Sequence, residues 1–90
     1  MILLDSKNVN TYINRGNAYY NKEFYDLAIG DYSEAIRLNP KSAIAYDNRG
    51  GAYEKMGERN QAIADYRTAL AIDPKFQRAR DSLNRLGVTT

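Results

Sequence analysis

The chain has 90 residues, of which 43% are hydrophobic and 27% charged, and its formal net charge is +2; this fits one small domain. It contains no cysteine and no histidine, which excludes a disulfide framework, a thiolate zinc site and an imidazole general base. The charge balance is too even to indicate nucleic acid or a membrane surface as partner, and no apolar run approaches the roughly 20 residues of a membrane helix.

The first eight residues have the pattern of a helix end. Residues 2–6 (ILLDS) line up with residues 36–40 (IRLNP) and 70–74 (LAIDP), at offsets that are multiples of 34. We therefore interpret residues 1–8 as the remnant of a preceding repeat or as an N-terminal extension, and we favour excision from a longer array. The start lacks the basic stretch of a signal peptide, so we expect a soluble, cytoplasmic protein.

Residues 9–42 are predicted to form a pair of helices. In 9–22, Tyr12, Gly16 and Tyr19 are spaced by four and three, which places them on one helical face. The second helix is predicted over 25–38, where the same spacing is kept by Ala28, Ile29, Tyr32, Ala35 and Ile36. Because the segment between the helices is Lys22-Glu23, the turn has to be made without glycine.

Residues 43–76 repeat this unit. Residues 12–19 recur as 46–53, and residues 28–32 recur as 62–66, in both cases 34 positions later. Helices are therefore predicted over 43–56 and 59–72, with Gly57 in the turn between them. Ser42 is expected to cap the third helix. Pro40 and Pro74 disfavour helix at the residue before each of them.

The tail, residues 77–90, continues as a predicted fifth helix that begins near residue 76 and ends at residue 86. One apolar stripe runs along it, made of Phe76, Ala79, Leu83 and Leu86. A single stripe with a polar remainder is typical of the capping helix of a stacked array. Gly87 is expected to end the helix.

The two units resemble tetratricopeptide repeats (TPRs), whose period is 34. The residues that carry the resemblance are Tyr12, Gly16, Tyr19, Ala28, Tyr32, Ala35 and Pro40, then Tyr46, Gly50, Tyr53, Ala62, Tyr66, Ala69 and Pro74. The resemblance implies an all-α fold, a right-handed superhelical stack of antiparallel helix hairpins (a TPR solenoid) with five helices. It covers nearly the whole chain, although Tyr12 and Tyr46 stand where the family usually has tryptophan.

Three packing expectations follow from these positions. Gly16 and Gly50 should let the first helix of each unit approach the second at Ala28 or Ala62. Tyr12, Tyr19 and Tyr32 should fill the space between hairpins, with hydroxyls that can reach the edge. Arg15 and Arg49, which replace the leucine usual in the family, are interpreted as aliphatic stems packed on the hairpin with solvated charged heads.

The resemblance implies a protein-interaction module whose concave groove is lined by the first helix of each unit. In this sequence the implied positions are Asn10, Ile13, Asn14, Asn17, Tyr20 and Asn21, then Ile44, Asp47, Asn48, Gly51, Glu54 and Lys55, with Arg78 and Arg85 from the capping helix. As candidate peptide-binding residues we take Asn10, Ile13, Asn14, Asn17, Tyr20, Asn21, Asp47, Asn48 and Arg78. Asparagine amides can hold the backbone of a peptide; the alternative is that they are only solvated.

Some members of the family hold the C-terminal carboxylate of heat-shock chaperones through a clamp of basic residues and amides. The corresponding positions here are Ile13, Asn17, Asn48, Arg78 and Ser82. Both amides match and Arg78 is a basic substitute, but Ile13 and Ser82 do not match. Most of the charge-assisted hydrogen bonding of the clamp is therefore missing, and we do not expect such a clamp.

The alternative function is self-assembly, because two repeats are fewer than the three or so that usually bury a continuous core. We expect Tyr25, Ile29 and Ile36 on the outer face of the first hairpin, in part exposed, which favours a homo-oligomer.

Catalysis, cofactors, metal ions and nucleic acid are not expected. The carboxylates Asp31, Glu34 and Asp65 are interpreted as surface groups paired with nearby arginines. The three arginines of the tail, Arg78, Arg80 and Arg85, are interpreted as a solubilising end of the chain.

Overall fold

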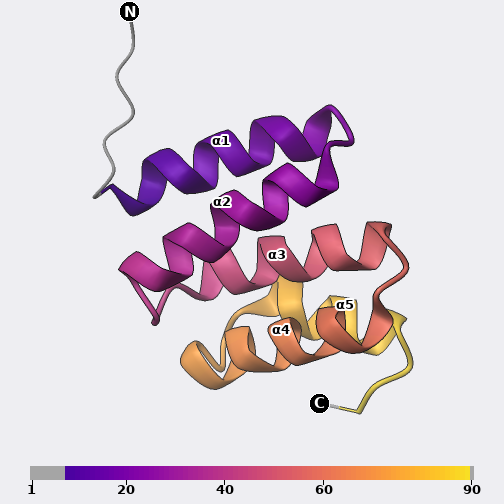
Figure 1. The fold of residues 1–90 in the computed structure, drawn as a ribbon. Helices are drawn as coiled ribbons and strands as arrows, with labels where there is room; N and C mark the ends of the chain where they lie inside the picture. The colour runs from indigo at the N-terminus through magenta and orange to yellow at the C-terminus, as the bar shows by residue number, and fades with distance from the viewer. Residues whose placement is uncertain (1–7, 90) are drawn as a thin grey trace, which may run out of the picture.

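The computed structural model describes residues 8–89. In chain order it contains α1 (Val9–Asn21), α2 (Tyr25–Leu38), α3 (Ala43–Lys55), α4 (Arg59–Ile72) and α5 (Gln77–Arg85). Figure 1 shows α1 to α4 stacked one after another as two antiparallel hairpins, with α5 beside α4. The predicted all-α fold and its five helices are confirmed. The predicted bounds agree with the observed ones at six of the ten helix ends and differ by one residue at the other four.

The connection after each hairpin has the same structure in both repeats. Asn39 and Asp73 leave the helical region with φ of −141° and −131°, as the prolines that follow them require. The side chain of each accepts a hydrogen bond from the amide two residues later, at 3.1 Å. Ser42 Oγ accepts from the Ala45 amide at 3.2 Å, which confirms the predicted cap of α3.

The turn inside each hairpin requires a left-handed backbone conformation. Gly57 has φ of 79°, and Glu23 occupies the equivalent position with φ of 65°. In the first turn the Phe24 amide donates to the Tyr19 carbonyl oxygen, and in the second the Glu58 amide donates to the Tyr53 carbonyl oxygen, both at 2.9 Å. The first hairpin therefore makes the same turn as the second, with a side chain where glycine is preferred.

The core is continuous from one hairpin to the next. Ala28 and Tyr32 of α2 are buried with Ala52 of α3, and the α4–α5 contact is sealed by Leu83. The expectation that Tyr25, Ile29 and Ile36 lie on an open outer face is wrong. They are half-buried in clusters that contain buried alanines of α3, because this face of α2 contacts the second hairpin.

A tyrosine ring lies directly on the glycine of the first helix in each hairpin. A Cβ atom added at Gly16 would lie 2.7 Å from the Tyr32 ring, and one added at Gly50 would lie 2.8 Å from the Tyr66 ring. Both tyrosines are at most 2% exposed. The predicted close approach is therefore present, but its contact is a tyrosine ring and not the alanine that we expected.

An arginine–aspartate pair joins the two helices of each hairpin. Arg15 holds Asp31 through two hydrogen bonds of 2.8 and 2.7 Å, and Arg49 holds Asp65 through two of 2.8 Å. The expected pairing is confirmed, but the aspartates are buried and not surface groups. The arginine heads carry these hydrogen bonds and stay partly solvated, since the side chains of Arg15 and Arg49 are 44% and 20% exposed. Each head lies over two rings, those of Tyr12 and Tyr19 or of Tyr46 and Tyr53.

Substituting Gly16→Ala should destabilise the fold, because the new methyl group would collide with the Tyr32 ring. Overpacking of a filled core costs about 1–3 kcal/mol. Gly30→Ala is the matched control, since a Cβ at Gly30 meets no atom within 4 Å and alanine gains about 1 kcal/mol in a helix. Urea unfolding of both variants measures the difference; equal stability of Gly16→Ala and the wild type would contradict the packing argument.

Substituting Glu23→Gly should stabilise the first hairpin, because the left-handed conformation costs a residue with a side chain about 1 kcal/mol. The reciprocal change, Gly57→Glu, should destabilise the second hairpin by a similar amount. Thermal unfolding checks both, and a Glu23→Gly variant that melts below the wild type would show that Glu23 makes a compensating contact.

Candidate functional site

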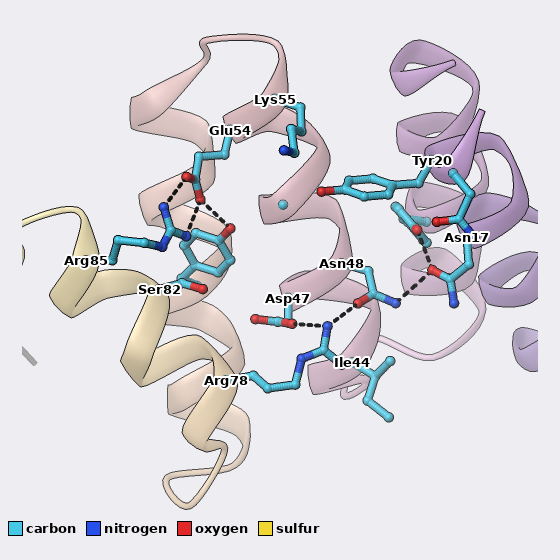
Figure 2. A pocket seen from close by; sticks show the side chains of 14 residues that line it. Asn17, Tyr20, Ile44, Asp47, Asn48, Glu54, Lys55, Arg78, Ser82 and Arg85 are labelled. Atoms are coloured by element: carbon cyan, nitrogen blue, oxygen red, sulfur yellow. Dashed lines mark hydrogen bonds and ion pairs between the residues drawn. The ribbon is translucent and has the colours of Figure 1, made fainter. Parts of the chain in front are cut away.

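An open groove of about 900 Å³ lies over the inner face of α3. Figure 2 shows α3 as its floor, with side chains of α1 on one side and of α5 on the other. Six of the nine candidate peptide-binding residues line it, namely Asn17, Tyr20, Asn21, Asp47, Asn48 and Arg78. The concave surface implied by the resemblance therefore exists, and most of the candidates lie together on it.

Three candidate residues are outside this groove. Ile13 is 8% exposed and belongs to a core cluster with Tyr12 and Ala45. Asn10 and Asn14 are exposed on the first half of α1 but do not line the groove. The groove includes only the second half of α1. The resemblance assigns all three residues to the concave surface, but they do not line this groove.

A chain of polar contacts crosses the floor of the groove. The Tyr32 hydroxyl and the Asn48 amide nitrogen both donate to Asn17 Oδ1, the latter at 3.2 Å. Arg78 Nη2 donates to Asn48 Oδ1 at 3.4 Å and pairs with Asp47 Oδ2 at 3.3 Å. Burial raises the pKa of Tyr32 to about 12, so its hydroxyl stays a donor. Because Asn17 Oδ1 is occupied, the amide nitrogen of Asn17 is the group left to meet a ligand.

A second ion pair crosses between α3 and α5. Arg85 donates to both oxygens of Glu54 at 2.5 and 2.9 Å, and the Tyr66 hydroxyl donates to Glu54 at 2.8 Å. The hydrogen bonds from Arg85 lower the pKa of Glu54. Glu54 is therefore a fully bonded, ionised group at this end of the groove.

Asp47 is the least satisfied polar group of the groove. It is 5% exposed, and within the described part of the chain its buried Oδ1 has no hydrogen-bond partner. Burial raises the pKa of Asp47, against the opposing effect of Arg78. An unpaired buried acceptor is costly, so the single contact with Arg78 leaves Asp47 in need of a donor.

Tyr20 forms an aromatic shelf on the α1 side of the groove. Its ring packs edge-on against Tyr25, with centroids 5.4 Å apart. It reaches toward α3 at Gly51, where an added Cβ would lie 3.9 Å from the ring (Figure 2). The absence of a side chain at Gly51 leaves space beside the ring, which suits a flat or aliphatic ligand group.

The selection of candidates from the sequence missed part of the site. Glu54 and Arg85 are implied by the resemblance but are not among the nine candidates. The Tyr32 hydroxyl is expected to reach the edge of the core, but its hydrogen bond to Asn17 is not predicted. Ser82, which does not match the clamp, also lines the groove. The available signal was the repeat-identical pair Tyr32 and Tyr66, whose hydroxyls both donate to polar side chains of the groove.

Two other kinds of site are not found between residues 8 and 89. No group of three or more His, Cys, Asp or Glu side chains could hold a metal ion there. No helix in the same range combines the length and apolar character needed to cross a membrane.

Arg80, the remaining arginine of α5, donates to the Pro74 carbonyl oxygen at 2.7 Å.

Comparison with family models gives two matches. A model described as "TPR repeat" matches residues 16–57, and one described as "Tetratricopeptide repeat" matches residues 43–76. The comparison with curated protein sequences finds no match.

Several solved structures are similar to this chain. The TPR domain of Arabidopsis OM64 has a TM-score of 0.88 and 30% identity, over 91% of this chain and 68% of that one. The first TPR domain of Spaghetti (RPAP3), bound to the HSP90 peptide SRMEEVD, has a TM-score of 0.88 and 28% identity, over 92% and 66%. The second TPR domain of human RPAP3, in complex with the HSP70 peptide SGPTIEEVD, has a TM-score of 0.87 and 29% identity, over 94% and 71%.

The helices, the groove and these matches agree. The repeat period, the hairpin geometry and the similarity to TPR domains over most of the chain lead to one conclusion. The chain belongs to the tetratricopeptide repeat family.

Proposed function

We propose that this chain binds a segment of a partner protein in the groove over α3, as one part of a larger TPR protein, and that it has no catalytic activity. The observation that carries the proposal is the convergence of Asn17, Asn48 and Tyr20 from two helices onto one open groove. Two of the similar structures hold a peptide, SRMEEVD or SGPTIEEVD, which supports a peptide as the class of ligand here.

The amides give the groove the chemistry that a peptide backbone needs. The hydrogen bonds to Asn17 Oδ1 fix the orientation of that side chain, so its amide nitrogen is available to donate to a carbonyl group. Amides arranged in advance lose little conformational entropy on binding. Tyr20 adds an aromatic surface of the kind that dominates protein interfaces. We assign the binding contacts to Asn17, Tyr20, Asn21 and Asn48.

A second candidate function is self-association through the first hairpin. Ala18 is exposed, whereas its repeat equivalent Ala52 is fully buried against α2. Phe24 and Leu27, near the start of α2, are 53% and 52% exposed. Exposed apolar side chains of this kind favour association where they form a patch. Sedimentation that finds a stable monomer at high micromolar concentration would count against this second function.

The double substitution Asn17→Ala with Tyr20→Ala should weaken peptide binding by at least about tenfold, because it removes a donor and an aromatic contact. Fluorescence anisotropy can measure this with peptides that the wild-type chain selects from a random heptapeptide library.

The matched control is Asn10→Ala with Asn14→Ala, which changes the same kind of side chain on the same helix outside the groove. It should leave the affinity unchanged, and neither pair of substitutions should change the oligomeric state in sedimentation. Equal affinity of the two double variants would refute the groove as the binding site.

A further inference from the structure

The acids and the arginines that face the groove differ in how exposed their side chains are. Asp47 and Glu54, on α3, have side chains that are 6% and 25% exposed, whereas their partners Arg78 and Arg85, on α5, are 69% and 57% exposed. In each pair the acid is therefore fixed in the floor and the arginine extends into solvent. An exposed arginine loses little when another cation takes its place, but a buried carboxylate always needs a partner.

The two pairs differ in how well the acid is satisfied. Glu54 accepts two hydrogen bonds from Arg85 and one from Tyr66. Asp47 has one ion-pair contact of 3.3 Å, and its Oδ1 has no partner within residues 8–89. The arginine that holds Asp47 is itself shared with Asn48 through a contact of 3.4 Å. Asp47 is thus the more weakly held of the two acids, and its contact with Arg78 is the one that a ligand cation replaces with the smaller loss.

We propose that Asp47 is a binding site for a lysine or arginine side chain of the bound segment. This inference rests on the proposed function and names the chemistry of its ligand. Asp47 lines the groove, and its Oδ2, the oxygen that Arg78 contacts at 3.3 Å, is the acceptor that the incoming cation meets. The incoming cation takes over the contact of Arg78, and the guanidinium of Arg78 turns into solvent.

The same arrangement disfavours an acidic ligand. Peptides such as SRMEEVD carry several carboxylates, and here they would meet the buried charge of Asp47 and arginines that already hold acids (Figure 2). Lys55 is the one groove cation for which the described residues show no ion pair, and it is exposed at the rim. One exposed lysine offers a carboxylate little, because water screens the attraction.

The test uses a random library of heptapeptides with acetylated and amidated ends, so that only side chains carry charge. The wild-type chain, Asp47→Ile and Asp47→Asn are each used to select peptides, which are then sequenced. The fold accepts isoleucine at this position of a repeat, because Ile13 is the equivalent residue of the first unit. Asp81→Asn is the matched control, since Asp81 is exposed on α5 outside the groove.

We expect the wild type and Asp81→Asn to enrich lysine or arginine at one peptide position. In both Asp47 variants the enrichment of lysine or arginine should fall about tenfold, which is the effect of losing one charge-assisted hydrogen bond. Selected peptides without a basic preference, or the same preference in the Asp47 variants, would overturn the inference and leave the proposed function standing. If the wild type selects no peptide at all, both fail.

A second measurement needs no peptide. Ethylguanidinium chloride is titrated into the wild-type chain at constant ionic strength, and the carboxyl carbon signals of Asp47 and Asp81 are followed by NMR. A saturable shift at Asp47 that exceeds the shift at Asp81 supports the site. Equal shifts at the two aspartates overturn it, whatever the library shows.

Discussion

The contact between a tyrosine ring and a glycine sets the geometry of each hairpin. Tyr32 lies on Gly16 and Tyr66 lies on Gly50, at distances that leave no space for a methyl group. The contact fixes how close the two helices are, and it also aims each hydroxyl at the groove. Tyr32 meets Asn17 there, and Tyr66 meets an acid of α3. One packing constraint therefore builds the core and orients polar groups at the floor of the groove.

Buried acids paired with more exposed arginines recur throughout the molecule. Asp31 and Asp65 are held by arginines of the same hairpin, and Asp47 is held across the groove by Arg78. The first two acids have two hydrogen bonds from a guanidinium, the geometry that compensates best for desolvation. The third has one long contact. The same pairing is thus complete inside the hairpins and incomplete in the groove. Polar groups that lack partners in a folded protein are typical of functional sites.

The sequence predicts the fold almost completely, because the period of 34 and local signals such as Pro40 and Gly57 indicate where helices end. The resemblance to TPRs implies which face of α1 and α3 forms the groove, although Asn10, Ile13 and Asn14 do not line it. The contacts across the groove could not be predicted in this way. Glu54 and Arg85 are 31 residues apart and meet only after α3 and α5 have been placed. The burial of Asp31 was missed for the same reason, since nothing local indicates that an arginine 16 residues earlier lies opposite.

The two arginines of the groove both belong to α5, the last and shortest helix, with nine residues. A helix of this length is marginal on its own, so α5 depends on its packing against α4, where Leu83 is buried. Asp47 and Glu54 therefore owe both of their cations to that packing. Any change that loosens the contact between α4 and α5 would remove the two cations together and leave an acidic surface on α3. The charge of the groove thus depends on an apolar contact that lies outside it.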